Sequence, residues 1–329
     1  MIPVFRFSGF NMIFKSLRWL QEMGILGMNR RNATYIMGSN PRSSFPIVDD
    51  KLLTKEIAAK FGVPTPPLYQ TIHYHGDIDR LKTSLSVPEG FVIKPARGAG
   101  GSGIILITGA GEGGFIKQSG EVISWKALTS HLSDVLSGVY SLGGAEDRAL
   151  IEALVKPDPV FSEITFRGVP DIRIVVYRGV PVMGMVRLPT KASDGKANLH
   201  RGAIGVGIDL KTGKTLSGVH RSQVVTHHPD TGKPVRGIDV PFWEGMLFIA
   251  ARATEMTGLG YLGVDLVIDD RRGPLLLELN ARPGLQIQIA NRMGLRGRLE
   301  MTEKASPGIL ATPEHRVAWA RETFGAPTA

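Results

Sequence analysis

Two carboxylates and a carboxamide fall on one predicted hairpin of this chain. Glu278 and Asn280 lie two residues apart in LLLELN (275–280), so on a strand their side chains point to the same face. The segment GVDLVID (263–269) predicts the partner strand, and a turn near residues 271–272 places Asp265 opposite Glu278. Buried carboxylates repel one another unless a cation lies between them, and oxygen ligands without His or Cys suit Mg²⁺. The pattern predicts a magnesium site; the alternative is a set of salt bridges to arginines on a sheet.

A glycine-rich loop supplies a second candidate for chemistry, in FVIKPARGAGGSGIILIT (91–108). Its glycines have the G-x-G-x-x-G spacing, but a dinucleotide-binding turn would open a helix, and here a β-branched run follows. The segment therefore predicts a strand, a flexible flap and a second strand, with Lys94 at the flap's root. Backbone N–H groups of such a flap can cover a phosphate chain. The alternative is an ordinary hairpin turn. The flap residues are Gly98, Gly100, Gly101, Ser102 and Gly103.

Four further cations could oppose the charge of phosphates and carboxylates: Lys51, Arg173, Arg201 and Arg282. Each lies beside a glycine loop or a predicted strand or helix end. Taken singly, each is better explained as a solvated surface cation than as a ligand; their placement together is what favours a binding role. Arg173 also shares a strand face with Asp171, and the alternative explanation for these two residues is a salt bridge between them.

The elements that must position these residues form a mixed pattern dominated by hairpins rather than by βαβ repeats. This pattern predicts an α+β protein. One helix begins at Asp49 or Asp50 and ends before Gly62, and a hairpin turns at Arg178–Gly179. Residues 194–207 read as a loop rich in glycine. The remaining predicted elements are helices over 77–85, 125–136, 240–258 and 313–324 and a strand over 148–155.

Composition limits the classes of function. The 329 residues are 43% hydrophobic and 21% charged, which is ordinary for a globular protein. The net charge of +9 favours an anionic partner, although the chain has no Lys/Arg run of the kind that binds nucleic acid. The absence of cysteine excludes disulfides and thiol nucleophiles. We expect a cytoplasmic protein.

The N-terminal residues 1–32 are basic, and apolar residues recur at helical spacing over 10–20. Such a helix can lie on an anionic membrane or on a partner protein, or it can pack on its own domain. The first alternative would make the protein peripheral at the inner face of the membrane.

The order of these motifs resembles that of ATP-grasp enzymes, in particular the RimK-type, alpha-L-glutamate ligase-like proteins. The resemblance covers about residues 28–300, and NLHRG (198–202) is its most characteristic segment. It implies two α+β lobes that grip ATP between antiparallel sheets. The implied divisions are a basic N-terminal segment (1–47), a catalytic domain (48–300, with a flap lobe at about 90–150 and a large lobe at about 151–300) and a tail (301–329).

The resemblance also implies a role for each site residue. Lys51 and Lys94 would hold ATP phosphates under the flap. Glu152 and Val155 would lie at the adenine hinge, with Asp158 near the ribose. Two Mg²⁺ ions, or Mn²⁺ in their place, would be held by Asp265, Glu278 and Asn280. Arg173, Arg201 and Arg282 would stabilise the transferring phosphoryl group and the acyl phosphate.

The implied activity is an ADP-forming carboxylate–amine ligase that handles glutamate or a glutamate-containing peptide. Two alternatives are phosphoryl transfer of the kinase kind and a nucleotide-binding scaffold without turnover. Only about 48 residues precede the first catalytic helix, fewer than the N-terminal domain of these enzymes. We therefore expect another subunit or a partner protein to complete the substrate cleft, and relatives of this kind often form oligomers.

Overall fold

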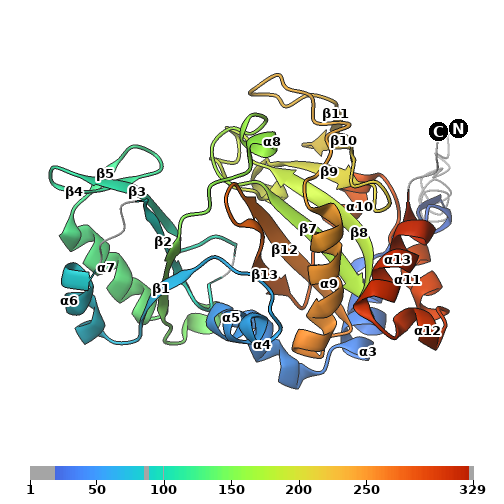
Figure 1. Ribbon diagram of the computed structural model, residues 1–329. Helices are drawn as coiled ribbons and strands as arrows, with labels where there is room; N and C mark the ends of the chain where they lie inside the picture. Colours follow the sequence, from blue (N-terminus) through green and yellow to red (C-terminus); the bar gives the residue numbers. More distant parts are fainter. Residues whose placement is uncertain (1–18, 85–88, 99, 326–329) are drawn as a thin grey trace, which may run out of the picture.

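The computed structural model describes residues 19–84, 89–98 and 100–325. Two antiparallel sheets, each with its own helices, form a smaller and a larger lobe (Figure 1). This arrangement confirms the predicted α+β class.

The smaller sheet has the order β1-β6-β2-β3-β4-β5. Strands β2 and β3 pair as a hairpin with Ile93 opposite Ile105, which confirms the strand–flap–strand prediction. The predicted flap lobe at 90–150 leaves out β1 and α6, which precede it. The strands are β1 (Leu68–Ile72), β2 (Phe91–Pro95), β3 (Ile105–Gly111), β4 (Gly114–Lys117), β5 (Val122–Ile123) and β6 (Ala149–Ala153).

The larger sheet has the order β11-β10-β9-β8-β7-β12-β13. Asp265 pairs directly with Glu278 across β12 and β13, as the turn position predicts. The turn at Arg178–Gly179 between β7 and β8 is confirmed as well. The strands are β7 (Asp171–Tyr177), β8 (Val180–Leu188), β9 (Ile204–Ile208), β10 (Thr215–His220), β11 (Gln223–Val225), β12 (Tyr261–Asp269) and β13 (Gly273–Asn280).

The prediction of a loop throughout 194–207 is wrong in its last four residues, which belong to β9. The two glycines of IGVGI do not mark a turn. A Cβ at Gly205 would come within 2.7 Å of Leu199, and one at Gly207 within 2.6 Å of Asn291. Glycine is therefore required because α10 (Gln286–Asn291) and the 199–201 turn lie directly against this strand.

The helices match the predicted boundaries closely. α7 (Trp125–Leu136) starts after the N-cap Ser124, and α9 (Trp243–Thr257) ends at Gly258 in the left-handed conformation. The other α-helices are α2 (Met28–Arg30), α3 (Met37–Ser39), α4 (Phe45–Asp49), α5 (Lys51–Lys60), α6 (His75–Ser84), α8 (Pro159–Ser162), α11 (Arg296–Glu303), α12 (Pro307–Leu310) and α13 (Pro313–Phe324). Short helical turns are η1 (Arg31–Ile36), η2 (Arg42–Ser44), η3 (Leu142–Gly144) and η4 (Leu199–Arg201).

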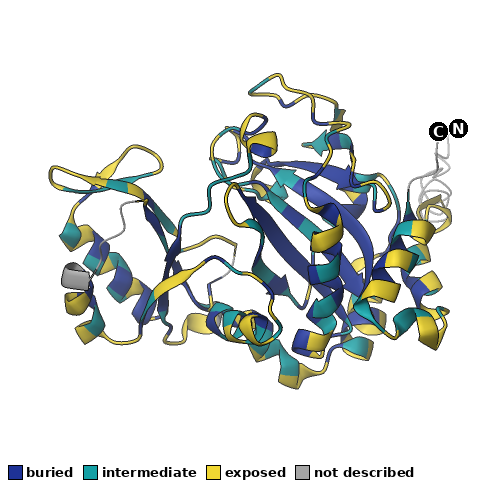
Figure 2. Ribbon diagram, viewed as in Figure 1, coloured by how far each residue is buried: buried dark blue, intermediate teal, exposed yellow. Residues whose placement is uncertain are grey.

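Each sheet has its own hydrophobic core, and the most continuous burial follows the central strands of the larger sheet (Figure 2). Residues on both sides of the catalytic domain predicted at 48–300 contribute to the larger core, among them Tyr35 and Phe324. A small third cluster of Leu52, Ala96 and Leu150 joins α5 to the smaller sheet. Helix α5 is thereby fixed beside the flap.

The amphipathic stretch predicted at 10–20 lies outside the described residues apart from its last two positions. In the part of the chain that the structure describes, every helix is too short or too polar to cross a membrane.

Candidate active site

Lys51 joins helix α5 to the root of the flap. It is the first residue of α5, whose N-cap Asp50 accepts hydrogen bonds from the backbone N–H groups of Leu52 and Leu53. The Lys51 backbone N–H donates to Ala96 O (2.9 Å), and its Nζ donates to Gly98 O (2.6 Å). Burial lowers the pKa of Lys51, and the nearby Glu278 carboxylate partly opposes this shift.

Lys94 is a buried cation with a buried counter-ion. Its Nζ lies 2.7 Å from Glu152 Oε2, and Lys55 Nζ lies 3.0 Å from Glu152 Oε1. Burial lowers the pKa of Lys55 to about 8. The Glu152 side chain is therefore paired with two lysines, and its role at the adenine hinge stays a prediction.

Two small cavities meet at the same three residues, Lys51, Gly98 and Glu278. The larger, of about 130 Å³, also contacts Asp49, Asn280 and Arg282. The smaller, of about 30 Å³, is lined by Lys94 and by flap residues that include Gly100, Gly101 and Ser102. The flap, α5 and β13 thus converge on one place, as the motif order predicts.

Glu278 and Asn280 fit a hard cation. Both are half-buried on β13 and line the 130 Å³ cavity, and Glu278 has no ion pair within the described part of the chain. A half-buried carboxylate beside an amide oxygen suits Mg²⁺. No cluster of three or more His, Asp or Glu residues is placed for a metal in the described ranges, but the predicted set contains only two carboxylates.

Asp265 is engaged by arginines. Arg173 Nε donates to its Oδ1 (2.7 Å), and Arg187 Nη2 and Asn280 Nδ2 donate to its Oδ2 (3.0 and 3.2 Å). Desolvation alone would raise the pKa of Asp265, but the two arginines outweigh it and hold the pKa at about 2. Its role as a metal ligand stays a prediction, because a cation there would have to compete with Arg173 and Arg187.

The alternative of a salt bridge between Asp171 and Arg173 does not hold. Asp171 pairs instead with Arg187 of β8, while Arg173 turns to Asp265 of β12. Both partners lie on neighbouring strands at matching register, where side chains come closer than those two apart on one strand. Burial raises the pKa of Asp171 to about 6, with Arg187 offsetting part of the shift.

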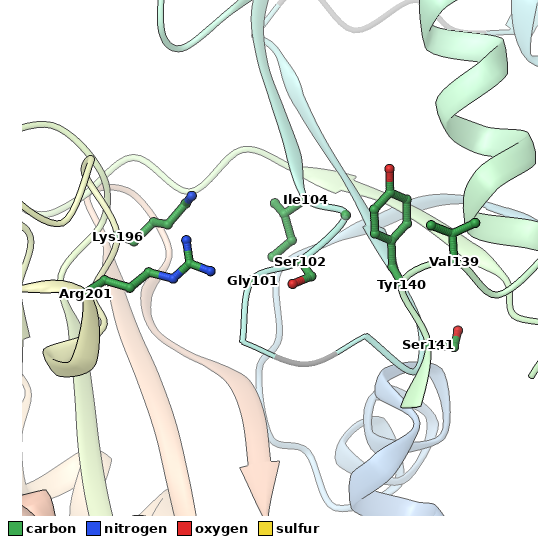
Figure 3. A pocket seen from close by; sticks show the side chains of 9 residues that line it. Gly101, Ser102, Ile104, Val139, Tyr140, Ser141, Lys196 and Arg201 are labelled. Atoms are coloured by element: carbon green, nitrogen blue, oxygen red, sulfur yellow. The ribbon is translucent and has the colours of Figure 1, made fainter. Parts of the chain in front are cut away.

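A third cavity, of about 570 Å³, opens on the other side of the flap (Figure 3). Arg201 of η4 and Lys196 extend toward the flap residues Ser102 and Ile104, and Tyr140 and Val139 lie beyond them in this view. Gly101, Ser102 and Ile104 line both this cavity and the 30 Å³ cavity, so the two cavities meet at the flap. Arg201 has no ion pair with the described residues.

The flap is anchored at both ends. Asp147, which is buried, accepts from the Arg97 backbone N–H (2.9 Å) and the Ser141 hydroxyl (2.7 Å) at the entry. At the exit, Gly103 has a φ of +72°, and its Cα lies so close to the Tyr140 ring that a Cβ would be 2.6 Å from it. His131 Nε2 bonds the Gly103 carbonyl at 2.9 Å.

Two residues predicted near the adenine and the ribose, Val155 and Asp158, lie outside the three cavities. Val155 and Asp158 follow β6 and line none of these three cavities. Asp158 caps α8 by accepting from Val160 N–H (2.9 Å). Their adenine and ribose roles stay predictions.

Sequence reasoning missed Asp49, Asp147 and Arg187 as residues of this region. Arg187 carried a signal, because an arginine within the apolar strand VPVMGMVRL is unusual without a buried partner. In the sequence, Asp49 carries only the signal of a helix start. Asp147 lies in a loop whose sequence carries no comparable signal.

Two α+β lobes, a glycine-rich flap and cations that converge beside it are together typical of one class of protein. This chain belongs to the ATP-grasp superfamily, and the family described as sugar-transfer associated ATP-grasp matches residues 30–304. The predicted ATP-grasp class is confirmed, and the narrower RimK-type branch stays a prediction. No curated protein matches the chain significantly.

Solved structures resemble the chain only distantly. The ATP-grasp ligase PsnB with a minimal precursor is 12% identical, with a TM-score of 0.40, over 95% of this chain and 72% of that one. D-alanine–D-alanine ligase from Bacillus anthracis is 14% identical (TM-score 0.42; 82% and 70% covered). D-cycloserine synthetase DcsG is 14% identical (TM-score 0.45; 90% and 80% covered). Similarity at this level does not define the chain's substrates.

Proposed function

We propose that this protein is an ATP- and Mg²⁺-dependent carboxylate–amine ligase. The observation that carries the proposal is the convergence of Lys51, Gly98 and Glu278, which line both small cavities. One cation, one flap glycine and one carboxylate from three separate elements meet there. This is the arrangement that a phosphate chain with its metal ion requires.

The residues for ATP phosphates are Lys51 and Lys94, with flap N–H groups above them. Glu278 and Asn280, joined by Asp265 if Arg173 and Arg187 release it, would hold one or two Mg²⁺ ions. Bound Mg²⁺ would neutralise phosphate charge at the site. The donor set fits such an ion, since it is made only of oxygen atoms.

The reaction has two steps. An oxygen of the substrate carboxylate forms a bond to the γ-phosphorus of ATP while the bond to the ADP oxygen breaks. An amine nitrogen then bonds to the acyl carbon, phosphate leaves with the bond's electron pair, and the nitrogen loses a proton. Arg201 and Arg282 would stabilise the oxyanions of these steps, because both lie at cavity walls.

Several finer points belong to the same proposal. Glutamate or a glutamate-containing peptide is the proposed amine or acid, supported by the RimK-like NLHRG segment and the net charge of +9. We also propose a protein partner or second subunit beside the cleft and a peripheral membrane contact through residues 1–32. The adenine would lie near Glu152, Val155 and Asp158.

The test is ADP formation with Mg-ATP and a panel of acids in the presence of hydroxylamine. Hydroxylamine converts an acyl phosphate into a hydroxamate, which mass spectrometry identifies. Parallel reactions replace hydroxylamine with amines, including glutamate and, because the family is described as sugar-transfer associated, an amino sugar.

A hydroxamate would support the ligase. ADP with a stable phosphorylated product would instead support a kinase. The proposal would be refuted if the protein binds ATP but forms no ADP with any acid of the panel, both as the purified protein and after addition of an extract of the source cells to supply partners.

A further inference from the structure

The 570 Å³ cavity beside the flap has a composition that selects for one kind of ligand. Its volume lies in the range of small-molecule sites, which is about 300–1,000 Å³. It shares the flap residues Gly101, Ser102 and Ile104 with the smallest of the cavities around Lys51 and Glu278. The cavity therefore borders the proposed phosphate site.

The charges of this cavity have one sign. Lys196 and Arg201 are its two charged side chains, and none of the described residues that line it is acidic. The nearest acidic neighbour of Lys196 is Asp194, which is 3.8 Å away and 93% exposed, so it holds Lys196 only weakly. An anion would find two donors here, whereas an ammonium group would find no counter-ion.

The rest of the cavity lining is uncharged and partly apolar. Val139 (64% exposed) and the Tyr140 ring lie on the far side with Ser141, and Ile104 (37% exposed) adds an apolar side chain from the flap. Figure 3 shows the two cations on one side of the flap residues and Val139 and Tyr140 on the other. A ligand that spans the cavity would place an anionic end on the cations and an uncharged body on this far side.

We propose that this cavity binds the acid that is activated, and that this acid is a carboxylate with an uncharged, apolar body and no free ammonium group. The inference rests on the proposed ligase function and narrows its substrate class. The carboxylate would lie at Arg201 beside Ser102, where the flap borders the phosphate site. The amine, including glutamate if it is the amine, would enter separately.

Binding can be tested apart from turnover with four simple probes. 3-Phenylpropanoate and L-phenylalanine share a body and differ by the α-ammonium group; glutarate and L-glutamate form the corresponding pair with a charged body. Ligand-observed NMR titrations to about 20 mM cover the Kd of about 1–5 mM expected for a fragment of this size. We expect 3-phenylpropanoate to bind at least about fivefold more tightly than the other three probes.

Variants assign the binding to this cavity. Lys196→Gln is expected to weaken 3-phenylpropanoate by about threefold to fivefold, whereas Lys191→Gln, an exposed lysine of the same loop outside the cavity, leaves the Kd unchanged. Val139→Asp, at an exposed position, adds a carboxylate to the far side. This variant should bind 3-phenylpropanoate more weakly than the wild type, and the difference in Kd between 3-phenylpropanoate and L-phenylalanine should become smaller.

The inference is overturned if 3-phenylpropanoate shows no saturable binding, if phenylalanine or glutarate binds as tightly, or if Lys196→Gln and Val139→Asp behave like Lys191→Gln. The hydroxamate assay separates the two proposals. A hydroxamate on another acid with a failed probe series would overturn only the substrate class. A successful probe series without a hydroxamate on any acid would overturn the ligase function, and with it the role of the bound acid, and would leave only the anion selectivity of the cavity.

Discussion

Replacing Glu152 with glutamine tests whether the stability of the fold depends on the buried ion pairs of Lys55 and Lys94. Glu152 is 2% exposed and lies between Lys94 Nζ (2.7 Å) and Lys55 Nζ (3.0 Å). At an effective dielectric constant of about 20, each ion pair contributes about 6 kcal/mol of attraction before desolvation is subtracted. Glu152→Gln keeps the shape of the side chain but leaves two buried ammonium groups without a counter-ion.

We expect Glu152→Gln to lower the free energy of unfolding by about 3–5 kcal/mol, the usual cost of removing one partner from a buried ion pair. For a chain of this size, that corresponds to a Tm lower by about 6–10 °C. Thermal unfolding by circular dichroism, at one pH near 7, measures the shift. The matched control is Glu300→Gln, because Glu300 also pairs with two cations, Arg30 and Arg296, but its side chain is 38% exposed. We expect the control to change stability by about 1 kcal/mol or less.

A double variant makes the test sharper. Lys55→Met removes one of the two cations, so adding it to Glu152→Gln should recover part of the lost stability, whereas two independent changes would add their costs. Two results would refute the idea that Lys55, Glu152 and Lys94 depend on one another: a Tm for Glu152→Gln within about 2 °C of that for Glu300→Gln, or a double variant whose loss of stability equals the sum of the losses of the two single variants.

Three further outcomes are expected. Lys51→Met should raise the Kd for Mg-ATP by at least about tenfold, since it removes a charge-assisted contact to phosphate; isothermal titration checks this against Lys60→Met, and equal affinities would remove Lys51 from the site. Glu278→Gln should lower Mg²⁺-dependent ADP formation by at least about 100-fold at unchanged Tm, and intact turnover would show that the metal assignment is wrong. Burial lowers the pKa of His131 below the value of about 6.5 that it has in the unfolded chain, so protonation opposes folding. The stability that neutral His131 contributes is therefore lost as the pH falls from about 6.5 through the lowered pKa. Urea unfolding from pH 8 to pH 5 should therefore show a wild-type advantage over His131→Gln that shrinks in acid, and a constant difference would contradict this role.

Local patterns in the sequence are sufficient for most of the elements. The turn at Arg178–Gly179, the cap before Trp125 and the end of α9 at Gly258 follow from glycine and capping chemistry within a few residues. The pairing of Asp265 with Glu278 follows from one short turn and the two-residue period of a strand. These features depend on interactions close in the chain, which a single sequence shows.

Pairings between distant strands could not be obtained in this way. Asp171 and Arg173 share a strand face, so the local sequence suggests that they pair. The sheet instead brings Arg187 to Asp171 and Asp265 to Arg173. In the same way, the glycines of IGVGI predict a loop from the sequence alone. In the structure this segment is a strand, and its glycines are required because α10 packs directly against it. Both errors have one cause, since the partner that decides the structure lies on another element.

The sequence by itself determined the class of this protein, because the order of the lysine helix, the glycine flap and the Asp–Glu–Asn hairpin is written in contiguous motifs. It also determined which oxygens and cations are available for chemistry. The tertiary structure decided which of them meet. Burial places Glu152 between two lysines and Asp265 between two arginines, and it leaves Glu278 and Arg201 without an ion pair among the described residues. A charge's partner depends on the packing of whole strands, and that packing is a property of the folded chain rather than of any motif.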